Sequence, residues 1–308
     1  IKALIDGWHM VKCFDLIGAI SLEAFDGRIE PFFDCIHQVR PHRGQIETAE
    51  RYRRLLEGSE IIAREKAHVQ DPYSFRCIPQ VHGAVKDAMY HVTNVLHTEI
   101  NSVTDNPTVF PDDDLVVSGG NFHGEPMALA FDFLGIACSE IADISERRTE
   151  RMVNAALSNG LTPFLTTQAG VNSGFMIVQY SAASMVSENK VLAHPASVDS
   201  IPSSANQEDM VSMGTTAARK AGWIVQNTFS VLADELLTAC QAIDIRRRLN
   251  THGQGISPVH QKVYELVREQ VDFYEIDREI RPDLEAVDRI VREEKLLQIV
   301  DEMVPDFD

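Results

Sequence analysis

The chain has 308 residues, of which 28 are Lys or Arg and 46 are Asp or Glu, so its formal net charge is −18. A chain this acidic repels phosphate backbones, so we expect no nucleic-acid partner unless basic side chains gather in a dedicated patch. The dense basic clusters at 51–54 and 246–248 are short and far apart, and we interpret both as solvated helix faces. The hydrophobic content of 44% is ordinary for a globular chain that buries a core.

The sequence also argues against a membrane-spanning segment, a disulfide framework and a metal site. The most apolar stretch, 127–138, contains Asp132 and is too short to span a bilayer, so we expect no membrane association. The five cysteines never form a C-x-x-C pair, which is typical of reduced thiols in the cytoplasm, and we expect no signal peptide. No H-E-x-x-H string occurs, and we expect no metal.

Apolar residues recur at helical spacing along most of the chain. In chain order, this pattern predicts helices at 45–57, 84–100, 126–158, 174–192, 208–243, 259–275 and 284–303. The two longest would measure about 50 and 54 Å at a rise of 1.5 Å per residue. Helices of this length cannot be covered by a compact monomer of this size, so we expect them to pack against other subunits.

Strand signals are limited to one place. Residues 108–110 and 115–117, separated by Pro-Asp-Asp-Asp, could form a small hairpin. The predicted fold class is therefore all-α, a bundle of long helices with at most one small β-hairpin. We divide the chain into a central bundle portion, 1–245, and a more charged helical C-terminal appendage, 246–308.

Four polar segments interrupt the helical pattern. In the first, Gln70, Tyr73 and Arg76 repeat every three residues, so a helical turn would place them on one face. Arginine is the side chain best shaped to hold a carboxylate through two parallel hydrogen bonds. The spacing by itself favours a simpler alternative, a loop with a capping Asp and a surface Arg.

The other three polar segments each precede a predicted helix, at 118–126, 170–176 and 197–209. The first two read as glycine-rich turns. In the third, Ser204 and Gln207 resemble a capping box, and Glu208 would suit a helix N-terminus. The same serines and carboxylates could instead form the floor of a pocket, and spacing does not decide between these interpretations.

The four segments together resemble the C-terminal three-fifths of the histidine ammonia-lyases, within the aromatic amino-acid ammonia-lyase family that uses a methylidene-imidazolone electrophile. The resemblance extends from about Ala3 through the segment 240–246 and is weaker in the tail. The strings that carry it, in chain order, are Arg43-Gly-Gln-Ile, Gln70-Asp-Pro-Tyr-Ser-Phe-Arg-Cys, Ser102-Val-Thr-Asp-Asn-Pro, Ser118-Gly-Gly-Asn-Phe-His, Ser145-Glu-Arg-Arg, Val171-Asn-Ser-Gly-Phe-Met, Ser187-Glu-Asn-Lys and Ser204-Ala-Asn-Gln-Glu-Asp. Eight strings in this order are very specific.

The resemblance implies a bundle of the ammonia-lyase and fumarase/aspartase type, assembled as a homotetramer whose active sites combine several subunits. It implies the deamination of L-histidine to urocanate and ammonia. Arg76 would hold the substrate carboxylate, with Tyr73 and Gln70 near the electrophile and substrate. Phe122 would pack against the imidazole or the electrophile ring. Glu208 would interact with the imidazole as a catalytic group. Relatives that act on phenylalanine or tyrosine tend to carry Gln at the last position, so Glu208 favours histidine.

The sequence departs from the family in one respect that bears on activity. The family forms its electrophile from an internal Ala-Ser-Gly, and that string does not occur here; the nearest string is Ala183-Ser184-Met185. The resemblance places it, with a mobile-loop Tyr and a substrate-binding His, in a part that would precede Ile1. We therefore expect this chain alone to be inactive. The alternatives are a non-catalytic helical scaffold, a family member acting on another aromatic amino acid, and a fumarase- or aspartase-like lyase.

Overall fold

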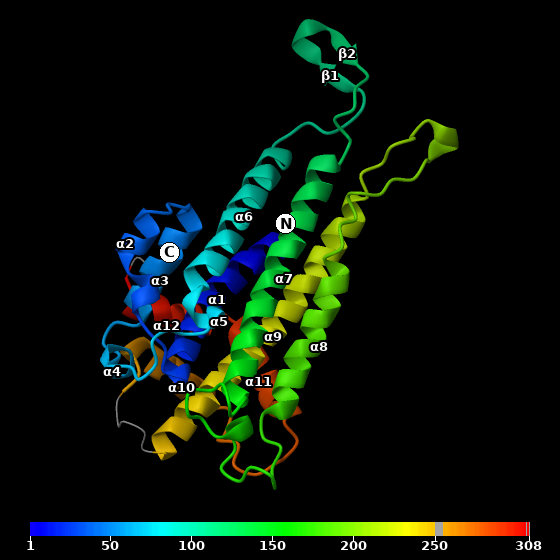
Figure 1. The fold of residues 1–308 in the computed structure, drawn as a ribbon. Coiled ribbons are helices and arrows are strands. Elements are labelled where there is room, and N and C mark those ends of the chain that lie inside the picture. The colour runs from blue at the N-terminus through cyan, green and yellow to red at the C-terminus, as the bar shows by residue number, and fades with distance from the viewer. Residues whose placement is uncertain (250–254, 306, 308) are drawn as a thin grey trace.

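The computed structural model describes residues 1–249, 255–305 and 307, and in this part the protein is an all-α bundle with one two-stranded sheet (Figure 1). The helices are α1 (Lys2–Phe25), α2 (Asp34–Gln38), α3 (Arg43–Leu55), α4 (Glu60–Ala63), α5 (Tyr73–Arg76), α6 (Ile78–Glu99), α7 (Glu125–Val153), α8 (Met176–Leu192), α9 (Gly214–Arg248), α10 (Pro258–Arg268), α11 (Arg281–Arg292) and α12 (Lys295–Met303). The strands are β1 (Thr108–Phe110) and β2 (Leu115–Val117). The predicted fold class is confirmed.

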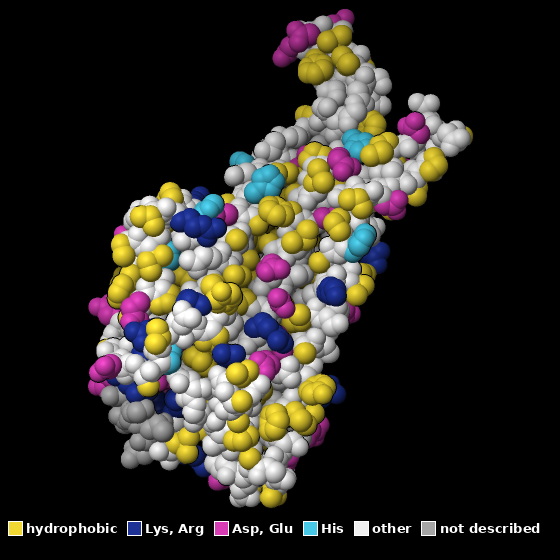
Figure 2. Space-filling model, viewed as in Figure 1, with side chains coloured by type: hydrophobic (Ala, Val, Ile, Leu, Met, Phe, Trp, Pro, Cys, Tyr) yellow, Lys and Arg dark blue, Asp and Glu magenta, His cyan; other side chains and the backbone are white. Residues whose placement is uncertain are grey.

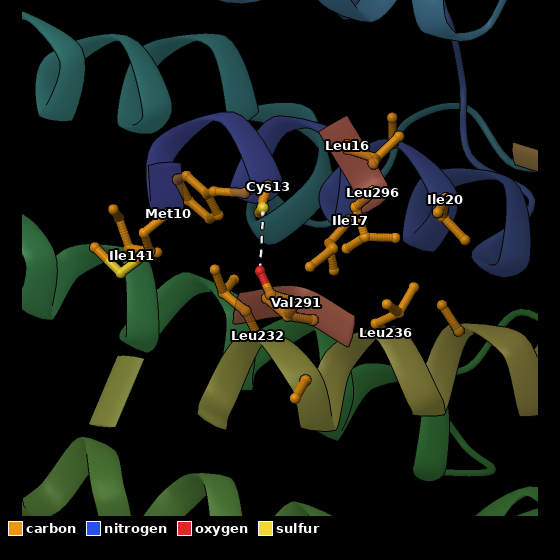
Figure 3. Close-up of a cluster of buried hydrophobic side chains, with 14 of the residues drawn as sticks. Met10, Cys13, Leu16, Ile17, Ile20, Ile141, Leu232, Leu236, Val291 and Leu296 are labelled. Carbon is orange, nitrogen blue, oxygen red and sulfur yellow. Dashed lines mark hydrogen bonds between the residues drawn. The ribbon is translucent and has the colours of Figure 1, made fainter. Parts of the chain in front are cut away.

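The long helices α1, α6, α7, α8 and α9 run side by side, and α7 packs most extensively on α9 (Figure 1). Figure 3 shows the centre of this core, where Met10 and Ile17 of α1 face Leu232 and Leu236 of α9. The Cys13 thiol donates to the backbone oxygen of Val291 across 3.7 Å, which joins α1 to α11 (Figure 3). These contacts remove apolar surface from water, and that removal is the main stabilising contribution to such a bundle.

Helix α1 is the element that the periodicity analysis missed. Every residue from Cys13 to Phe25 is buried, because α3, α6, α7, α9 and α12 all pack around it. A helix that is enclosed on all sides carries no polar face, and the three-and-four spacing of apolar residues then disappears.

Several predicted helices end or begin elsewhere. Helix α6, predicted from residue 84, already begins at Ile78. The prediction for 126–158 is too long because Asn154 ends α7, where its side-chain oxygen accepts from the Ala156 N–H at 3.2 Å. The prediction for 208–243 starts too early and stops too soon. Helix α9 begins only at Gly214, because the preceding residues form an extended loop, and it continues to Arg248.

The C-terminal part of the chain folds back on the bundle. The predicted helix at 259–275 ends earlier, at Arg268, and the one at 284–303 is divided by the extended backbone of Glu293 into α11 and α12. Apolar residues of α10, α11 and α12 belong to the same buried cluster as α1 and α9. The division of the chain into 1–245 and 246–308 stays a prediction.

The interpretation of both basic clusters as solvated faces is wrong for one arginine in each. Arg51 is buried and pairs with the buried Asp15 across 3.2 Å. Arg246 is buried too, and its Nη2 donates to the Phe25 backbone oxygen at 2.9 Å. Charge density along the sequence does not reveal this, because each partner lies far away in the chain.

Two arms project beyond one end of the bundle (Figure 1). The first carries the predicted hairpin, in which β1 pairs antiparallel with β2 and Val109 faces Val116. The second is the loop 197–213 between α8 and α9. None of the helices in the described residues is both long enough and apolar enough to cross a membrane.

Candidate active site

A cavity of about 460 Å³ opens beside α5, the short helix that carries two of the predicted site residues. Its lining residues are Arg28, Glu30, Pro31, Ile36, Val69, Gln70, Asp71, Tyr73, Arg76, Cys77 and Gln80. The structure therefore brings Gln70, Tyr73 and Arg76 together on one wall. Only Tyr73 and Arg76 share the helical turn that the spacing of three predicts, because Gln70 lies before the extended Pro72 that precedes α5.

The Arg76 guanidinium is held by its two predicted neighbours. Its Nη1 donates to Gln70 Oε1 at 2.6 Å, and its central carbon lies 4.8 Å from the centre of the Tyr73 ring. Its Nε is buried and has no hydrogen-bond partner among the described residues. A guanidinium that is fixed on one side and has a free donor is well suited to bind a carboxylate.

The segment that carries Arg76 is anchored by the residues between its functional side chains. Asp71 is only 2% exposed and accepts from the Arg28 backbone N–H and from His68 Nε2, each at 2.7 Å. Phe75 stacks on Phe25 at the end of α1, with ring centres 4.4 Å apart. Asp71 thus joins the loop to the residues after α1. It does not cap α5, whose N-cap position is Pro72 and makes no side-chain hydrogen bond.

Phe122 and Glu208 belong to a second group, on the two projecting arms. Phe122 is 58% exposed and Glu208 is also exposed. Glu208 is paired through its backbone with Ser203, at 2.8 and 3.2 Å. The two loops meet where His123 Nε2 lies 3.1 Å from the Met210 backbone oxygen.

The capping interpretation of the segment before α9 is wrong. Ser204 lies in a short 3₁₀ turn, Ser204–Asn206, and six residues separate Gln207 from the first residue of α9. Glu208 therefore stands outside the first turn of α9, where a helix dipole acts. Its carboxylate is presented by an exposed loop.

The two groups lie at opposite ends of α6 (Figure 1). Arg76 precedes the first residue of α6, whereas the loop of Phe122 contacts the residues that follow its last turn, through Asn121 and Val103. The 22 residues of α6 correspond to about 33 Å. One chain therefore does not bring the five predicted residues together, and a pocket that uses all of them requires more than one copy.

A buried ionic network, absent from the sequence predictions, lies inside the bundle. Asp15 accepts from His82 Nδ1 at 2.9 Å and from Lys86, and Arg148 Nη2 donates to Glu235 Oε2 at 2.8 Å. Burial alone would raise the pKa of Asp15, but Lys86, His82 and Arg51 hold it well below its usual value. Burial lowers the pKa of His82 to about 3.

This network has no signal in the sequence, because its members are single polar residues within apolar helices. None of its members lines the cavity of Arg76, and we interpret the network as structural. In the described part of the chain, no group of three or more His, Cys, Asp or Glu is arranged to hold a metal ion.

Comparisons with known proteins agree with this architecture. Residues 1–269 match the family model described as aromatic amino acid lyase. The chain is 55% identical over 298 residues to a histidine ammonia-lyase from Caldanaerobacter subterraneus subsp. tengcongensis, and 52% identical over 297 residues to one from Natranaerobius thermophilus. Each alignment covers 96% of this chain and 58% of the relative, so the chain spans about three-fifths of their length.

Solved structures show the same fold. The chain superposes on histidine ammonia-lyase from Trypanosoma cruzi with a TM-score of 0.90 and 43% identity, covering 99% of this chain and 57% of that one. It superposes on tyrosine aminomutase from Streptomyces globisporus with a TM-score of 0.92 and 35% identity, covering 98% and 61%. With its bundle of long helices and a family match over most of its length, this chain belongs to the aromatic amino acid lyase family.

Proposed function

We propose that this chain forms part of an ammonia-lyase that converts L-histidine to urocanate and ammonia. The observation that carries the proposal is the Arg76 guanidinium, held by Gln70 and Tyr73 on a cavity wall with one donor unpaired. That arrangement is suited to an amino-acid carboxylate. The likeness to two proteins named histidine ammonia-lyase supports the choice of substrate.

Each residue of the site has a distinct task in this reaction. Arg76 binds the carboxylate, and the exposed phenol of Tyr73 lies on the same wall, near the amine that leaves. Glu208 accepts an N–H of the imidazole or exchanges a proton with it, and Phe122 packs on a ring. The electrophile that the family forms from Ala-Ser-Gly would make the amine a better leaving group. The polar wall beside Arg76 and Tyr73 fits a charged amino acid presented to such a group.

The substrate pocket, in this proposal, forms between copies of the chain in a homotetramer. Leu129, Phe133 and Ile136 make an exposed apolar stripe on α7, and yellow side chains are visible along this face in Figure 2. We define these three residues as the α7 stripe. The stripe belongs to a segment whose sequence predicts a position inside a bundle, and a second copy packed on α7 would place it there. The arms that carry Phe122 and Glu208 would then meet the Arg76 cavity of a neighbour.

Glu208 favours histidine over other aromatic amino acids, because a carboxylate pairs with ring N–H groups that phenylalanine and tyrosine lack. A cytoplasmic location is part of the same proposal and agrees with five cysteines that are all free thiols. A non-catalytic scaffold would need no carboxylate-binding wall. That hypothesis therefore does not explain why Gln70 and Tyr73 hold Arg76 on the cavity wall.

The test is a chimera that joins this chain to the part of the Caldanaerobacter relative that it does not match. We expect the chimera to form urocanate from histidine, followed by its ultraviolet absorbance, and the 308-residue chain to form none. Acid–base assistance is worth only about 10²–10⁴-fold, whereas enzymes typically supply 10⁶-fold or more. A folded, tetrameric chimera without activity would contradict the proposal, and turnover by the chain alone would show that it has another electrophile.

A further inference from the structure

Gln80 is a side chain of the cavity that none of the preceding roles uses. It lies in the first turn of α6, four residues after Arg76, and lines the same cavity. Its Oε1 is buried and has no hydrogen-bond partner among the described residues. A buried acceptor without a donor is costly, so such an atom in a folded protein calls for an explanation, such as a bound water or ion or a functional role.

The other amide and carboxylate side chains of this wall each accept a hydrogen bond already. Gln70 Oε1 accepts from Arg76, and Asp71 accepts from Arg28 and His68. Glu30 accepts from Arg28. The amide oxygen of Gln80 is therefore left for a ligand.

Arg76 and Gln80 together present an unpaired donor and an unpaired acceptor. Arg76 Nε is the buried donor, and Arg76 and Gln80 line the same cavity. An α-amino acid carries the matching pair of groups, an anionic carboxylate that accepts and a cationic ammonium that donates, on adjacent carbons. The unpaired donor of Arg76 and the unpaired acceptor of Gln80 therefore match the carboxylate and the ammonium of a zwitterionic amino acid.

We propose that Gln80 is a specificity-determining residue whose Oε1 accepts a hydrogen bond from the α-ammonium group of the substrate. This proposal rests on the function proposed above and adds to it the group that recognises the amine. A carboxylic acid without the amine binds Arg76 equally well but leaves Gln80 Oε1 unpaired. The site therefore discriminates against des-amino analogues through a buried acceptor that they cannot satisfy.

Gln80 also lines a neighbouring cavity of about 310 Å³ with Arg40, His42 and Phe133. A side chain from a second copy of the chain, inserted there, could supply the missing donor instead. The two explanations differ in a measurable way, because only recognition of the ammonium makes Gln80 distinguish ligands that differ in that group.

The first experiment measures binding to the 308-residue chain by ligand-observed NMR at millimolar concentrations of L-histidine and imidazole-4-propionate, its des-amino analogue. We expect histidine to bind more tightly to the wild-type chain. Gln80→Met should weaken histidine about tenfold and the analogue less than twofold. Gln80→Glu keeps an acceptor and should keep the preference for histidine. Gln298→Met, at an exposed position on α12, serves as the control and should change neither ligand.

Equal losses for both ligands, or a wild-type chain with no preference between them, would overturn the assignment. Kinetics of the chimera separate this failure from failure of the proposed function. An active chimera in which Gln80→Met leaves KM for histidine unchanged would refute the role of Gln80 alone. A chimera without activity, whose chain still loses its preference for histidine on Gln80→Met, would refute the lyase function and retain the ammonium site.

Discussion

Gly44 of α3 and Gly83 of α6 bring two helix backbones into direct contact. A Cβ atom built on Gly44 would lie 2.1 Å from the backbone oxygen of Gly83, and one built on Gly83 would lie 2.4 Å from the Gln45 nitrogen. Both distances are far below contact range, so neither position accepts a side chain without separating the helices. This crossing sits beside the start of α6, where Gln80 faces the cavity.

Gly83→Ala should therefore destabilise the protein by about 1–3 kcal/mol or more, because the added methyl group meets backbone that cannot yield. The measurement is the free energy of unfolding in urea. The matched control is Gly222→Ala in the middle of α9, where nothing lies within 4 Å of the new atom. There the change should stabilise by about 0.5–1 kcal/mol through helix propensity. Equal effects at the two positions would contradict the close contact.

His82 should make the protein sensitive to acid. Burial lowers its folded-state pKa to about 3 from an ordinary value of 6.5, although Asp15 raises it and Arg148 and Lys86 lower it further. Between these two values the unfolded chain binds a proton that the folded chain does not, so stability falls as pH decreases from about 6.5 toward 3. The lowered pKa of Asp15 adds to this loss below about pH 4, since its carboxylate must be ionised to hold the network.

The contribution of His82 is isolated by urea titrations between about pH 6 and 4.5. There His82→Asn should reduce the slope of unfolding free energy against pH by about 1.4 kcal/mol per pH unit, which corresponds to one proton. His97→Asn, at an exposed position on the same helix, should leave the slope as in the wild type. An unchanged slope for His82→Asn would show that His82 binds a proton equally in both states.

Arg76→Lys in the chimera should lower kcat/KM for histidine by about 5- to 150-fold. Lysine keeps the positive charge but loses the two-pronged geometry, which is worth about 1–3 kcal/mol to a bound carboxylate. Arg281→Lys changes an exposed arginine on α11 that pairs with Glu285, and it should have no effect on turnover. An Arg76→Lys chimera with full kcat/KM would assign Arg76 a structural role.

Glu208→Gln in the chimera should lower turnover of histidine by roughly 10²-fold while the melting temperature stays the same. The amide hydrogen-bonds but cannot exchange a proton, and the exposed loop position gives the carboxylate no helix to stabilise. Asp209→Asn removes a charge from the neighbouring residue of the same loop and is the control. A shifted melt with normal turnover would place Glu208 among the structural residues.

Association of the chain should depend on the α7 stripe. Phe133→Asp puts a charge at the centre of the stripe and should convert a tetramer, observed by light scattering at micromolar concentration, to smaller species. Ile276→Asp alters a more exposed apolar residue, in the segment between α10 and α11, and should leave the assembly intact. A wild-type chain that stays a soluble monomer would argue against the tetramer itself.

Much of the fold could be predicted from the sequence where a helix has one buried and one exposed face. Helices α3 and α8 were located within two residues at each end, because their apolar positions follow the helical period. Helix α6 begins six residues before its predicted start. Helix α1 escaped detection because it is enclosed on all sides, and the break at Glu293 escaped because backbone conformation there has no strong residue signal.

In the candidate site, too, the sequence predicted local geometry and left the long-range contacts undetermined. The local motif predicted that Tyr73 and Arg76 share one face, since neighbours three apart in a turn do so whatever the rest of the chain does. Gln70 lies on the same wall but outside that turn, where it accepts a hydrogen bond from Arg76. The sequence also indicated the family, through eight ordered strings, and Glu208 is the residue on which the proposed preference for histidine depends.

Tertiary structure alone decided which polar side chains are buried and which atoms remain unpaired. The pairing of Arg51 with Asp15, the interior position of Arg246 and the unpaired oxygen of Gln80 all depend on segments that are distant in the chain. It also decided that Arg76 and Glu208 lie toward opposite ends of α6. The physical reason is that local sequence fixes periodicity and turn chemistry, whereas burial and pairing are set by which helices come to lie against one another.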